Sequence, residues 1–259
     1  MRACCVYRLR RPLLVCLLVT AASAIWSDAA DRYAVVELFT SQGWNSCPPA
    51  DAALAQLASS TAADERVIAL EWDVDYWDYL GWPDPYGSRD ASLRQRSYAA
   101  AMRSRSVYTP QMVVNGRRVI SATHRSERVA AEVADVYGRS SDRDIEVEVS
   151  AQRRVADGLQ VDYRLRGVPA DVVLTVVVAE DGLRNYVPRG ENAGRTLEHV
   201  NVVRGQASAL LRRGVAEHVG SLDVSFPADV DLQRSTVVAL VHSAASRWVL
   251  ATTWVAANE

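Results

Sequence analysis

The feature that most constrains the fold is a buried strand that runs through a short turn into a helix beginning on two prolines. Residues 33–39 read YAVVELF, an apolar and β-branched run that is typical of a buried strand. Pro48 and Pro49 then open a predicted helix over residues 50–59, because proline is accepted in a first helical turn, where its missing N–H would be unpaired anyway. Cys47 therefore lies at or just before the N-terminus of that helix.

The residues that follow complete a strand–helix–strand unit and a hairpin. An apolar run from residue 66 predicts a second strand that ends between residues 70 and 74, and the length of the connection suits a right-handed crossover to a parallel neighbour. The remaining predicted elements are a helix over 88–104, a strand over 107–115, a tight turn at Asn115-Gly116, a returning strand over 117–121 and a helix over 126–137.

The pattern changes beyond residue 140, where short strand-like runs are separated by turn signals. IEVEVS and LQVDYRL alternate, VVLTVVVAE is a continuous β-branched run, and STVVALVHSA followed by WVLATTWV resembles a hairpin. A chain of 259 residues, 49% of them hydrophobic, is long enough for two domains. The predicted fold class is an α/β domain over residues 30–139, followed by a mainly antiparallel, sandwich-like β domain over residues 144–259.

The N-terminus has the layout of a cleaved signal peptide. Four arginines precede an apolar run over residues 13–22, and Ala22-Ser23-Ala24 supplies small residues at the −3 and −1 positions. The apolar run is shorter than the roughly 20 residues that a membrane-spanning helix needs. We therefore expect residues 1–24 to be removed, leaving no stable membrane anchor, and the protein to be periplasmic or secreted. A twin-arginine signal at Arg10-Arg11 is the alternative to general secretion.

Processing at this position would leave a single cysteine. Cys4, Cys5 and Cys16 lie in the part expected to be removed, so Cys47 alone remains. Exported proteins normally carry paired cysteines because their compartment is oxidising. A single leftover thiol is therefore either buried and inert or reactive toward another molecule.

A set of five segments, spread over most of the mature chain, carries a family resemblance. The segments are VVELFTSQGWNSCPPAD, VDYWDYLGW, the Arg94-Gln95 pair, VYTPQMVVNG and RGENAGRTLEHVNVVR. Together they resemble a family of secreted bacterial proteins catalogued as domain of unknown function family 1223, which has a thioredoxin-like fold. The resemblance implies that the α/β domain over residues 30–139 is thioredoxin-like.

The chain departs from this family at its Cys-x-x-Cys motif. Trp44 stands where the first cysteine of the family falls, and Cys47 is the second. In thioredoxin-like proteins the first cysteine attacks a substrate disulfide, and the second resolves the mixed intermediate. A dithiol cycle cannot close on one thiol, so the resemblance implies a degenerate motif whose activity is lost or reduced to one-thiol chemistry.

Cys47 remains the candidate catalytic residue. Its place at a helix N-terminus favours the thiolate, whereas an apolar setting opposes ionisation. An inert thiol buried behind Trp44 is the alternative. Thr109-Pro110 resembles the cis-proline corner that lies beside the cysteine motif in thioredoxin-like folds and offers backbone groups to an extended substrate. Trp44, Thr109 and Pro110 are therefore the candidate substrate-binding residues.

The acidic and aromatic segment over residues 72–86 has two interpretations. Its aspartates, Asp73, Asp75, Asp78 and Asp84, could bind a divalent cation or perform acid–base chemistry. Alternatively, they cap backbone N–H groups in an ordered loop while the aromatic residues pack. The spacing does not match a calcium loop, so the second interpretation is favoured.

The remaining polar residues form no recognisable metal or cofactor motif. The histidines, His124, His199, His218 and His242, show no paired spacing for zinc, and no metal and no cofactor are predicted. The RGENAGRTLEH stretch is predicted to be a long loop of the second domain. Three charged residues of this loop are candidates to face the Cys47 cleft: Arg189, Glu191 and Arg195.

These observations favour an exported thioredoxin-like protein without dithiol oxidoreductase activity, acting as a binding or accessory module for a peptide, a protein or a small thiol. The alternative is a one-thiol redox protein that forms mixed disulfides through Cys47, so whether the protein is an enzyme stays open. The formal net charge of −2 gives no field that would attract nucleic acid, and nucleic acid is not an expected partner.

Overall fold

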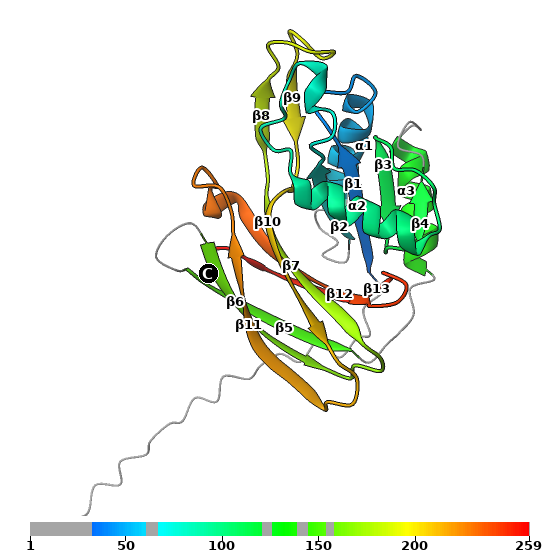
Figure 1. Cartoon of the computed structure of the whole chain (residues 1–259), viewed down its shortest axis with the longest axis vertical. Coiled ribbons are helices and arrows are strands. Elements are labelled where there is room, and N and C mark those ends of the chain that lie inside the picture. Colours follow the sequence, from blue (N-terminus) through cyan, green and yellow to red (C-terminus); the bar gives the residue numbers. More distant parts are fainter. Residues whose placement is uncertain (1–32, 61–66, 121–125, 139–144, 154–157, 259) are drawn as a thin grey trace, which may run out of the picture.

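The computed structural model describes residues 33–60, 67–120, 126–138, 145–153 and 158–258 (Figure 1). The predicted signal peptide and most of the predicted domain boundary lie outside the described residues. Within the described residues, none of the helices has the length and apolar character that crossing a membrane would require. The fold is mixed α/β, with an eight-stranded mixed sheet, three α-helices and two smaller antiparallel sheets.

The first half of the chain follows the predicted order of elements. These are β1 (Ala34–Thr40), α1 (Pro48–Ser60), β2 (Val67–Asp73), a 3₁₀ turn η1 (Asp78–Leu80), α2 (Arg89–Ala101), β3 (Gln111–Val114), β4 (Arg118–Ile120) and α3 (Ser126–Gly138). The predicted tight turn is present, since Asn115 and Gly116 both have positive φ, at 49° and 63°. The Ser88 side chain caps α2 by accepting the N–H of Ala91 at 3.1 Å.

The second half is built from strands. These are β5 (Glu146–Arg153), β6 (Gly158–Arg166), β7 (Val172–Glu180), β8 (Leu183–Tyr186), β9 (Thr196–His199), β10 (Val202–Leu211), β11 (Glu217–Ser225), a 3₁₀ turn η2 (Leu232–Arg234), β12 (Ser235–Ser243) and β13 (Val249–Ala256). Strands β11, β6 and β5 form an antiparallel sheet whose buried side chains, among them Leu159 and Val161, pack against β7 and β12. The second half is therefore mainly β-structure, with a small antiparallel sheet packed against strands of the larger mixed sheet.

The two halves share one sheet, an arrangement that the sequence did not indicate. The strand order is β13-β12-β7-β10-β2-β1-β3-β4, so four strands of the second half extend the sheet of the first (Figure 1). The joint is between β10 and β2, which run parallel with Val202 opposite Glu71. The N–H of Glu71 donates to the carbonyl of Asn201 at 3.1 Å.

Strand β2 separates two cores, because successive side chains of a strand point to opposite faces. Ala69 faces the core beneath α1 and α3, which includes Leu54 and Val133. Leu70 and its alternating neighbours Ile68 and Trp72 face the other core, where α2 meets buried valines and leucines of β7 and β12. Both faces of β2 are therefore covered, and residues 68–73 are all buried.

Candidate functional site

Cys47 lies at the start of α1 with no exposed surface. Its carbonyl accepts the N–H groups of Ala50 at 2.8 Å and Asp51 at 3.1 Å, which begin the helix. Burial, followed by the carboxyl group of Asp51, raises the pKa of the Cys47 thiol to about 12, although hydrogen bonds from Thr40 and Thr109 oppose the shift. Desolvation therefore outweighs any effect of the helix N-terminus, and the thiol is protonated at neutral pH.

The predicted binding residues surround this thiol. The Trp44 ring stacks on Trp77 with a centroid distance of 4.3 Å, and the Trp77 indole N–H donates to the Thr109 hydroxyl at 2.7 Å. The Thr109-Pro110 peptide bond is cis, as the family resemblance implies. Trp44 is half-buried, whereas Thr109 and Pro110 are buried. All four predicted site residues thus lie together, with a stacked indole pair on the outer side.

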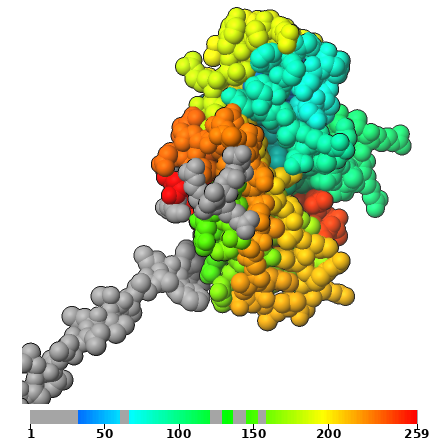
Figure 2. Space-filling view, turned by 60° about the vertical axis from the view of Figure 1, so that its left-hand side comes forward, coloured from blue at the N-terminus to red at the C-terminus, as the bar shows by residue number. Residues whose placement is uncertain are grey.

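The β8–β9 hairpin of the second half packs on the turn before α1. The buried Asn192 side-chain amide donates to the carbonyls of Gln42 at 2.9 Å and Trp44 at 3.2 Å. The Asn45 N–H donates to Glu191 Oε2 at 3.0 Å. Figure 2 shows this hairpin (yellow) against residues 70–90 (cyan). Glu191 therefore reaches the Trp44 turn, as the sequence suggested, whereas Arg195 bonds to Asn192 and Arg189 is exposed.

The aspartates of the segment 72–86 divide into two kinds. Asp84 accepts the N–H of Gln42 at 2.7 Å and of Tyr86 at 3.0 Å, and Asp78 accepts the N–H of Asp84 at 3.1 Å. These two confirm the capping interpretation, and Asp75 accepts the Ser92 hydroxyl. Asp73 is the exception, because it is buried and its carboxyl oxygens accept no N–H or hydroxyl group of the described residues. Its side-chain contact is with the carboxyl group of Asp84.

Asp73 belongs to a buried polar cluster that the sequence did not predict. Glu71 and Asp73 on β2, His199 at the end of β9 and Asp51 on α1 are each at most 4% exposed. The His199 Nδ1 lies 2.5 Å from Glu71 Oε1, and the N–H of Val200 donates to Glu71 Oε2 at 3.2 Å. The only sequence signal was a pair of carboxylates at alternate positions of an otherwise apolar strand, VIALEWD.

The electrostatics of this cluster are dominated by burial. Burial, followed by the charge of Glu71, raises the pKa of Asp51 well above its usual value. Burial, followed by Asp84 and Glu71, does the same to the pKa of Asp73. Burial lowers the pKa of His199, but the surrounding carboxylates outweigh it and raise the value to about 9. The cluster therefore contains more acid groups than the single imidazole can neutralise.

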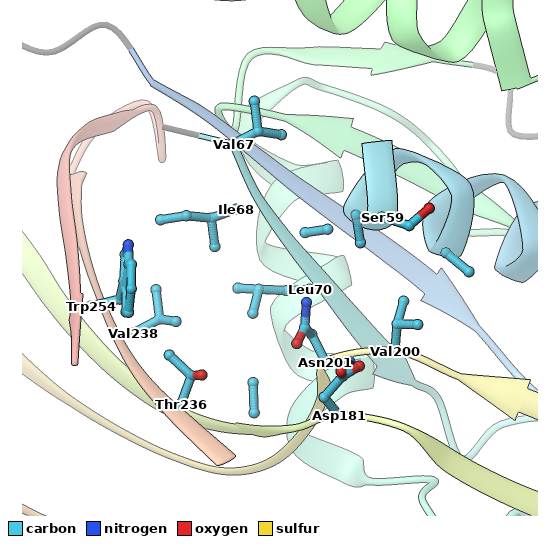
Figure 3. A pocket seen from close by; sticks show the side chains of 14 residues that line it. Ser59, Val67, Ile68, Leu70, Asp181, Val200, Asn201, Thr236, Val238 and Trp254 are labelled. Carbon is cyan, nitrogen blue, oxygen red and sulfur yellow. Dashed lines mark hydrogen bonds between the residues drawn. The ribbon is translucent and has the colours of Figure 1, made fainter. Parts of the chain in front are cut away.

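A separate apolar cavity of about 440 Å³ lies between α1, β2 and the strands β12 and β13 (Figure 3). Its lining includes Ile68, Leu70, Val238 and Trp254, with Asp181 and Asn201 at one side. Neither Cys47 nor Trp44 lines it. The cavity is therefore not part of the candidate site.

Comparisons with known proteins agree with this architecture. The family described as "Protein of unknown function (DUF1223)" matches residues 35–242. Protein AGR_C_4864 from Agrobacterium tumefaciens is 24% identical, with a TM-score of 0.61 over 90% of this chain and 97% of that one. HBP35 of Porphyromonas gingivalis is 12% identical, with a TM-score of 0.68 over 88% of this chain and 76% of that one. No curated protein matches. The chain belongs to the DUF1223 family of proteins of unknown function.

Proposed function

We propose that this chain is an exported thioredoxin-like protein that lacks dithiol oxidoreductase activity and acts as a binding module for an extended peptide or protein segment. The observation that carries the proposal is the state of Cys47. Its sulfur is fully buried and its pKa is raised to about 12, whereas a nucleophilic cysteine needs an accessible thiolate. The same observation argues against the one-thiol alternative.

The surface above Cys47 supports a binding role. The stacked pair Trp44 and Trp77 presents rigid aromatic area beside Thr109 and Pro110, and such aromatic residues dominate the energetics of binding sites. The Trp44 turn is held from behind by Asn192 and Glu191 of the β8–β9 hairpin. The pre-ordered turn reduces the entropy that a ligand must offset on binding.

The inertness of Cys47 can be measured by alkylation. At pH 7.5 we expect the native chain to react about a thousandfold more slowly than an unperturbed cysteine, because a pKa near 12 leaves far less thiolate than a pKa of about 8.5. The rate should rise with pH throughout the range 7 to 10 without reaching a plateau. The urea-unfolded chain is the control and should react as an ordinary thiol. A native rate that levels off below pH 8 would establish the one-thiol alternative instead.

Binding can be tested with an array of peptides of mixed sequence, probed with the labelled protein. The variant Trp44→Ala should lose at least about tenfold in affinity for the peptides that bind, because it removes a central aromatic anchor. The matched control is Trp248→Ala, since Trp248 is 42% exposed and contacts Arg117 rather than the Cys47 region. Equal binding by wild type and the Trp44 variant would overturn the proposed site.

A further inference from the structure

The buried carboxyl group of Asp73 accepts no N–H or hydroxyl hydrogen bond from the residues that the structure describes. The residue is 1% exposed, and the side chain within hydrogen-bonding reach of its carboxyl group is the carboxyl group of Asp84. Leaving a buried polar group unpaired costs about 1–3 kcal/mol, and more when the group is charged. Because β2 alternates its side chains between two faces, Asp73 points to the same side as Glu71. The unpaired oxygens therefore lie within the buried polar cluster.

The side chains around Asp73 offer the donor atoms of a metal site. One ligand atom each from Glu71, Asp73 and His199 can be chosen so that all three lie within 4.8 Å of one another. The imidazole contacts Glu71 through Nδ1, while its Nε2 has no partner in the part of the chain that the structure describes. Two carboxylate oxygens that accept no N–H or hydroxyl group, and an imidazole nitrogen without a partner, thus occur among these described residues.

The number of carboxyl groups in the cluster also favours a positive partner. Asp51 and Asp84 are buried beside these residues and contribute to their electrostatics. Buried carboxylates are costly unless they are paired, protonated or bound to a metal. A proton on Asp73, donated to Asp84, would relieve part of the repulsion but would leave the imidazole nitrogen unpaired. A divalent cation bound by the imidazole and the carboxylates would balance the charge of these groups.

We propose that Glu71, Asp73 and His199 bind a divalent first-row transition-metal cation of the zinc type. Imidazole nitrogen combined with carboxylate oxygen suits Zn²⁺ better than Ca²⁺ or Mg²⁺, which prefer oxygen ligands alone. A water molecule completes the four ligands of the proposed zinc site. The site joins β2 to β9, because Glu71 and Asp73 belong to β2 and His199 to β9. It does not depend on the proposed peptide-binding function.

The test is a measurement of zinc bound to the intact protein. The purified chain is stripped with a chelator, dialysed against Zn²⁺, and analysed for metal content and for its thermal midpoint. We expect one zinc per chain and a higher midpoint with zinc, because a ligand that binds only the native state stabilises it. Mg²⁺ at the same concentration should leave the midpoint unchanged.

The variant Asp73→Asn should lower zinc affinity by at least about tenfold. Its amide retains the shape of the carboxyl group and removes its charge. The matched control is Asp90→Asn, because Asp90 is exposed on α2 and should leave zinc binding unchanged. A wild-type protein that takes up no zinc would overturn the proposal, and so would undiminished binding by the Asp73 variant. If a variant fails to fold, the zinc content and thermal midpoint of the wild-type chain still decide whether the site binds zinc.

Discussion

Arg94 connects the two halves of the molecule at the level of single side chains. Its Nε lies 2.5 Å from Glu37 Oε1 on β1, and its Nη2 lies 3.2 Å from His242 Nε2 on β12. Tyr98 donates its hydroxyl to the other oxygen of Glu37. Burial, followed by the charge of Arg94, keeps the pKa of His242 well below its usual value, so the ring is neutral and its Nε2 accepts the Arg94 hydrogen bond.

Replacing Arg94 by alanine should lower the free energy of unfolding by about 3–5 kcal/mol, because it leaves the fully buried Glu37 without its counter-charge. The measurement is equilibrium unfolding in urea. The control is Arg212→Ala, which breaks a pair with Asp171 in which the arginine is 70% exposed and should cost at most about 1 kcal/mol. Similar costs for the two variants would show that the Glu37–Arg94 pair is not a buried ion pair in solution.

At the scale of elements, the sequence predicted those helices and strands whose formation depends on residues close together in the chain. The predicted strand and the predicted helix that starts at Cys-Pro-Pro are present as β1 and α1. Both follow from short-range patterns, an apolar run and two prolines in a first helical turn. Cys47, Trp44, Thr109 and Pro110 were placed by resemblance to a family, and they do lie together. Their function stays a proposal.

The sequence did not predict the pairing of β10 with β2 or the buried polar cluster, because both depend on contacts between residues far apart in the chain. Nothing in the run VVRGQASALL of β10 indicates that Val202 pairs with Glu71, because the register between distant strands is not a local pattern. The sequence predicted an apolar strand ending between residues 70 and 74, and it placed Asp73 in the acidic segment that follows. Glu71 and Asp73 are buried because α1 and the β8–β9 hairpin lie over the face of β2 to which they point, which also brings His199 into contact with Glu71.

At the scale of the whole molecule, the shared core predicts one cooperative unfolding transition. Leu70 of β2 packs in the same buried cluster as Val177 of β7 and Leu240 of β12, so neither half can open without exposing apolar surface of the other. Thermal melts followed by far-ultraviolet and by near-ultraviolet circular dichroism should therefore coincide. Two separated steps would indicate that the halves are stabilised independently.

The joint between β2 and β10 also has a consequence for biosynthesis. The chain is made from its N-terminus, so β2 is complete long before Val202 emerges from the ribosome. During that interval its backbone N–H and C=O groups on one edge have no strand beside them, and an open edge can pair with other chains. This edge of β2 therefore stays unpaired, and open to aggregation, until the chain has been synthesised past β10.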